Sequence, residues 1–74
     1  MKHARKDYQE RIQDRLSLEA GGIPWDEPVF LLRAQDETAP DTVRYWAIRA
    51  AKVGAEPRMV RAALLQADAM EVWQ

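Results

Sequence analysis

The sequence predicts a mainly α-helical protein that forms one small domain over residues 1–74. Three segments carry apolar residues at helical spacing, and glycine and proline separate those segments. Only one short apolar run is typical of a strand. A length of 74 residues, with 47% apolar and 31% charged residues, is typical of a single globular domain.

The first expected helix covers the residues from Arg5 to Ala20. Tyr8, Ile12 and Leu16 recur at every fourth position and form one narrow apolar stripe among charged residues. The glycine pair at 21–22 and the proline that follows it favour a helix end there. Because a stripe this narrow gives a marginal helix, we expect it to dock on the rest of the protein or on a second copy.

The segment at 28–33 is a short apolar run that is either extended or helical. A continuous apolar run of this length is consistent with a buried strand. Asp26 as an N-cap and Arg33 in a last turn would equally suit a helix. We favour the extended form, in which a lone strand must pair with a symmetry mate or with the sheet edge of a partner.

The next helix has the clearest predicted ends. Thr38 and Asp41 have the spacing of a capping box, Pro40 suits a first turn, and Gly54 ends the helix. Its apolar stripe consists of Val43, Trp46, Ala47 and Ala50.

A last helix is expected from Pro57 to the C-terminus. Its apolar stripe consists of Val60, Ala63, Leu64, Ala67 and Met70. The link between the last two helices is short, so they should form an antiparallel or sharply angled αα pair. Alanines in both stripes allow the two helices to approach closely.

The residue types that catalysis and metal binding need are nearly absent. The chain has no cysteine, one histidine (His3) and one serine (Ser17), so we expect no enzyme activity, no metal site and no cofactor. It also lacks an apolar run of membrane-spanning length and a secretory signal, which predicts a cytoplasmic protein without membrane contact.

One face of the helix that ends at Gly54 is the candidate partner-binding surface. It combines cations with an aromatic and a β-branched residue, which are Arg44, Tyr45, Ile48, Arg49 and Lys52. Tyrosine and arginine often anchor protein interfaces, and cations beside an aromatic also suit a nucleic-acid backbone. The alternative is a solvated face whose Tyr45 and Ile48 are covered by the N-terminal helix.

Two further sets are candidates for contacts. Glu37 and Asp41 form a possible acidic contact, in a stretch from 21 to 42 that has one basic and five acidic residues. Leu65 and Val72 lie on the polar face of the last helix and are either a dimer seam or core residues under the N-terminal helix. A homodimer is expected because so short a chain buries little surface alone.

The whole chain resembles a family of short uncharacterised proteins encoded by phages and prophages. The resemblance rests on MKHARKDY at 1–8, RIQD at 11–14, DEPVFLLRAQD at 26–36, AP at 39–40, TVRYWA at 42–47 and ADAMEVWQ at 67–74. The run at 26–36 is its most specific part, and the chain departs from the family pattern at 15–22.

The resemblance implies a protein that acts in the bacterial host cytoplasm without catalysis. Small prophage proteins of this kind often act as inhibitors or adaptors of host machinery. The resemblance therefore implies binding to a host protein or nucleoprotein complex, which could inhibit a defence system in the manner of an anti-CRISPR protein. Two alternatives stay open. One is a small DNA-binding regulator that uses the basic helix face, and the other is a structural or assembly component of a phage particle.

Overall fold

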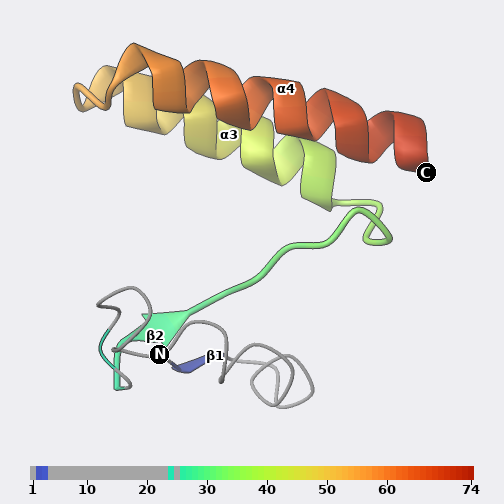
Figure 1. Ribbon diagram of the computed structural model, residues 1–74, viewed down its shortest axis with the longest axis horizontal. Helices are drawn as coiled ribbons and strands as arrows, with labels where there is room; N and C mark the ends of the chain where they lie inside the picture. Colours follow the sequence, from blue (N-terminus) through green and yellow to red (C-terminus); the bar gives the residue numbers. More distant parts are fainter. Residues whose placement is uncertain (1, 4–23, 25) are drawn as a thin grey trace. The chain divides into compact units, whose positions relative to one another are not determined.

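The computed structural model describes residues 2–3, 24 and 26–74, and the expected helix from Arg5 to Ala20 lies outside these residues (Figure 1). Contacts divide the chain into two compact units, residues 1–31 and residues 32–74. The prediction of one domain over the whole chain stays a prediction. The mainly helical class is confirmed, because two helices account for most of the described residues.

The first unit contains a parallel pair of short strands. Strand β1 (Lys2–His3) pairs with β2 (Pro28–Val29), with Lys2 opposite Pro28 and His3 opposite Val29. The extended form expected at the start of the 28–33 run is therefore confirmed. The expectation that this strand needs a second chain is wrong, because the start of the same chain supplies its partner. A strand of two residues is too short to leave an alternating pattern in the sequence.

The second unit is a helical hairpin. Helix α3 (Ala39–Lys52) and helix α4 (Pro57–Trp73) pack side by side and run in opposite directions (Figure 1). The predicted αα pair is confirmed, including the start of α4 at Pro57. Neither helix of the described part is long and apolar enough to cross a membrane.

The start of α3 differs in detail from the predicted capping box. Pro40 falls in the first turn as expected, but the Thr38 side chain makes no capping hydrogen bond. Instead, the Thr38 backbone N–H and hydroxyl both donate to Oδ1 of Asp36, at 2.8 and 2.7 Å. Asp41, the other member of the predicted box, pairs with Arg44. The capping box was therefore wrong because both of its side chains have nearer partners.

The turn between the helices is a Schellman motif closed by Gly54. The backbone N–H of Gly54 donates to the carbonyl of Ala51 (3.2 Å), and that of Ala55 donates to the carbonyl of Ala50 (2.9 Å). Gly54 has a φ of 87°, a left-handed conformation that side chains disfavour. This confirms the predicted helix end and explains the sharp reversal of the chain.

The open end of the hairpin is tied together by Gln74. Its side-chain amide donates to the backbone carbonyls of Ala34 (3.0 Å) and Asp36 (2.8 Å). The segment that leads into α3 is thereby held against the end of α4.

The core of the hairpin is made of alanine. The buried residues in the described part are Pro40 and four alanines, Ala39, Ala47, Ala50 and Ala67, and no large side chain there is fully buried. Trp46, a member of the predicted apolar stripe, keeps 47% of its surface exposed. Small side chains let the helix backbones approach closely, but they bury little apolar area, so the hairpin gains little from the hydrophobic effect.

Candidate functional site

The outward side of α3 carries four of the five predicted partner-binding residues. Ile48, Arg49 and Lys52 lie three, four and seven residues after Tyr45, so the four residues form one continuous stripe, here called the α3 face. All four are exposed, with Tyr45 at 65% and Ile48 at 54%. The buried Ala47 and Ala50 lie on the other side of the helix, against α4.

The α3 face carries positive charge that has no counterion among the described residues. In the part of the chain that the structure describes, no salt bridge involves Arg49 or Lys52, and the face itself contains no carboxylate. Tyr45 and Ile48 place an aromatic ring and a branched aliphatic side chain beside these cations. The arrangement offers an apolar contact and two cationic side chains to a partner that carries carboxylates or phosphates.

Arg44, the fifth predicted residue, lies at the junction of the two helices. Its guanidinium donates to Asp68 (2.9 Å) and Glu71 (2.9 Å) on α4, and to Asp41 (3.2 Å) one turn earlier on α3. The side chain keeps only 29% of its surface exposed. The structure therefore separates Arg44 from the α3 face and gives it a role in holding α3 against α4.

The surroundings of Arg44 are rich in negative charge. Hydrogen bonds to Glu71 first, and then to Asp68, raise the pKa of the Arg44 guanidinium above its ordinary value, so it stays charged wherever the protein is folded. One cation faces three carboxylates, so the cluster has a formal charge of −2. Each of these carboxylates belongs to an exposed side chain and has a second oxygen for another cation.

The predicted acidic contact is divided between two environments. Glu37 is exposed in the turn that precedes α3, whereas Asp41 belongs to the Arg44 cluster. The two carboxylates therefore do not form one acidic site.

The two residues of the predicted dimer seam are both exposed on α4. Leu65 exposes 62% of its surface and Val72 exposes 88%. They are seven residues apart, which places them on one side of the helix, away from the buried Ala67.

Sequence reasoning missed a group of apolar residues on the side of the hairpin opposite the ion cluster. Trp46 follows Arg44 by two residues, and Met70 follows Asp68 by two, so each lies about 160° around its helix from the ion cluster. Met59 (53% exposed) and Trp73 (69%) share this side of α4. Finding this grouping required the relative rotation of the two helices, which the ion pairs of Arg44 define.

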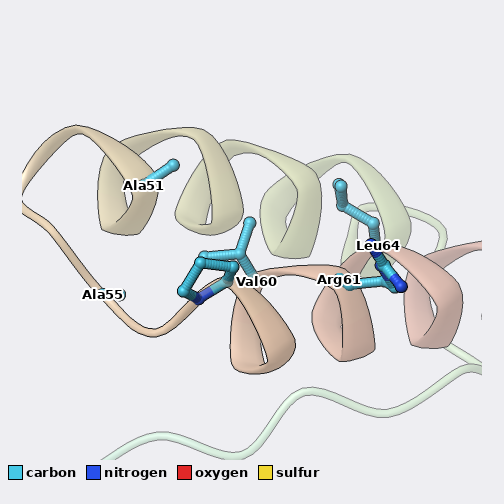
Figure 2. Close-up of a pocket in the computed structure, with 6 residues that line it drawn as sticks. Ala51, Ala55, Val60, Arg61 and Leu64 are labelled. Atoms are coloured by element: carbon cyan, nitrogen blue, oxygen red, sulfur yellow. The ribbon is translucent and has the colours of Figure 1, made fainter.

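A shallow hollow lies near the turn, between the end of α3 and the start of α4 (Figure 2). Its volume is about 320 Å³. The lining is apolar apart from one arginine and consists of Ala51, Ala55, Pro57, Val60, Arg61 and Leu64. A hollow lined in this way can take an apolar side chain of a partner, but it holds no pair of groups for acid–base chemistry.

Comparison of the chain with protein-family models, curated proteins and solved structures found no match. The resemblance to phage and prophage proteins stays a prediction.

Proposed function

We propose that this chain is a non-enzymatic binding protein that uses the α3 face to contact an acidic surface of a host protein or nucleoprotein complex. The observation that carries the proposal is the α3 face itself. Arg49 and Lys52 lack counterions among the described residues, and they lie beside an exposed tyrosine and an exposed isoleucine.

The chemistry of the α3 face favours a protein over a duplex as partner. Tyr45 and Ile48 gain most when an apolar contact covers them, and arginine beside tyrosine is a frequent interface anchor. Phosphates would be repelled by the acidic cluster around Arg44, which lies on the same hairpin and has a formal charge of −2. The resemblance to prophage proteins adds the finer part of the proposal, which is stoichiometric, anti-CRISPR-like inhibition of a defence complex.

Affinity capture from a nuclease-treated bacterial lysate, with mass spectrometry, tests the proposal. The wild-type chain should enrich one host complex, and the double variant Arg49→Glu with Lys52→Glu should lose it, because a carboxylate on the partner would then face carboxylates. Arg58→Glu is the control, since it reverses an exposed arginine on the other helix. Circular dichroism should give the same helical signal for all three proteins.

Two results would contradict the proposal. Equal recovery of the complex by the double variant would exclude the α3 face, and loss of the complex in the Arg58→Glu control would point to net charge alone.

The DNA-binding alternative is tested with the same variants. A duplex should shift on a gel at low salt and release as salt rises if that alternative holds, and no shift at low salt excludes it.

A further inference from the structure

The outward side of α4 carries an apolar stripe with the spacing of a helix–helix seam. Ala62, Leu65, Ala69 and Val72 follow one another at intervals of three, four and three residues, and all four are exposed. This is the a/d pattern by which two helices interlock. The stripe, here called the α4 seam, faces away from α3, because Leu65 lies about 160° around the helix from the buried Ala67.

The charges beside the α4 seam are separated along the helix. Arg61 in the first half of α4 and Asp68 in the second half flank the seam. Arg58 lies on the line of the seam, seven residues before Leu65, and Glu71 lies toward α3. Arg61 has no salt bridge among the described residues, and the only one of Arg58 is a 3.6 Å contact between exposed groups. Asp68 and Glu71 share the single cation Arg44 with Asp41, so the second half of α4 keeps excess negative charge.

We infer that the α4 seam binds the α4 seam of a second copy of this chain in an antiparallel arrangement, with Leu65 near the two-fold axis. In this arrangement the basic half of each α4 lies beside the acidic half of the other. Arg61 and Asp68 are seven residues apart and so lie on the same side of α4, as a two-fold pairing between them requires.

The charges select this arrangement over a parallel pair. A parallel pair would place Arg61 beside its own copy and Asp68 beside its own copy, which repels at both ends of the helix. The alanines at 62 and 69 let the helices approach closely enough for Leu65 and Val72 to interlock. This pairing leaves the α3 face free, so it is independent of the proposed function.

The mass of the full chain in solution is the first test. Light scattering over about 1 µM to about 1 mM should show a monomer that becomes a dimer as the concentration rises. Leu65→Glu should keep the protein monomeric over this range, because it buries a carboxylate at the two-fold axis. Ile48→Glu is the matched control, an exposed apolar residue of α3 that should leave the dimer unchanged.

Cysteine cross-linking tests the direction of the helices, because the natural chain has no cysteine. In an antiparallel pair, Ala62 of one copy lies near Ala69 of the other. A mixture of the Ala62→Cys and Ala69→Cys proteins should therefore form a mixed disulfide, and neither variant should link efficiently to itself.

Three results would overturn the inference. These are a monomer at every concentration, a dimer that survives Leu65→Glu, and efficient self-linking of each single cysteine variant, which is the pattern of a parallel pair. The capture experiment tests only the α3 face. If the Arg49 and Lys52 double variant loses the host complex but still forms the dimer, the inference about the α4 seam is unaffected.

Discussion

Arg44 is the residue whose role differs most from its prediction. The sequence places it next to Tyr45 and within a cationic stretch, so it was grouped with the partner-binding residues. The side chain lies at the edge of the helix contact, where Asp68 and Glu71 of α4 come within 2.9 Å. No sequence spacing reveals these partners, because they lie 24 and 27 residues away. Only the i,i+3 pair with Asp41 was within reach of sequence reasoning.

Replacing Arg44 with methionine should weaken the hairpin. The variant keeps most of the apolar stem but leaves three carboxylates facing one another without a cation. The midpoint of urea unfolding should fall, and the difference from the wild type should narrow as salt screens the repulsion. Lys52→Met is the control and should not change the midpoint, because Lys52 is exposed and has no salt bridge among the described residues. A fall that is equal at low and high salt would contradict this electrostatic account.

Ala47 is the residue whose small size matters most. It is 1% exposed and faces α4, so a leucine there would force the helices apart. Ala47→Leu should lower the free energy of unfolding by about 1–3 kcal/mol, the usual cost of overpacking. Ala51→Leu, one turn later on the same helix and exposed, should change it by less than about 0.5 kcal/mol. Equal values for the two variants, from urea unfolding followed by circular dichroism, would show that the contact tolerates added volume.

At the scale of single elements, helix ends were predicted better than helix caps. Gly54 and Pro57 are read directly from residue type, because only glycine adopts a left-handed backbone without strain and proline suits a first turn. The cap at Thr38 depends on which oxygen reaches which N–H. Asp36 competes for Thr38 and Arg44 competes for Asp41, and a spacing rule does not include these competitors.

Gly54 should stabilise the turn after α3 only because it adopts a left-handed backbone conformation, and not because space for a side chain is lacking. A Cβ added at this position meets no atom within 4 Å, so the cost of Gly54→Ala comes from the left-handed φ of 87°. We expect a loss of about 1–2 kcal/mol in the free energy of unfolding. Gly54→Asn should lose less, because asparagine tolerates this conformation better. If alanine and asparagine are equally harmful, some contact of the turn, rather than its backbone conformation, is being lost.

At the scale of the whole hairpin, charge is separated between its two ends. Toward the turn, four cations outnumber the one carboxylate, Glu56; the cations are Arg49, Lys52, Arg58 and Arg61. Toward the open end, five carboxylates outnumber the cations Arg33 and Arg44; the carboxylates are Asp36, Glu37, Asp41, Asp68 and Glu71. The sequence already contained part of this pattern, as an acidic stretch up to residue 42 and a basic remainder. The antiparallel fold sharpens it by returning the acidic end of α4 to the start of α3. Both proposed interactions use this separation, so both should weaken as salt rises.

The least predictable feature is which residues far apart in the sequence contact each other. The helix pair followed from two apolar stripes and a short link, which are local properties of the sequence. The partner of β2 is a two-residue strand at residues 2–3, and the cluster around Arg44 joins positions far apart in the chain. The exposure of the α3 face follows from helical periodicity alone, because its residues lie opposite the apolar stripe of α3. Its role as a binding surface stays a prediction.

The alanine core also constrains how this sequence can diverge. Most protein cores lose stability when a large side chain is replaced by a smaller one, and related sequences avoid such changes. The buried alanines of this hairpin have almost no volume to lose; they are Ala39, Ala47, Ala50 and Ala67. Divergence at these sites is limited by size, so glycine and serine should be accepted where leucine and valine are rejected. Selection would then retain a pattern of small residues at these positions.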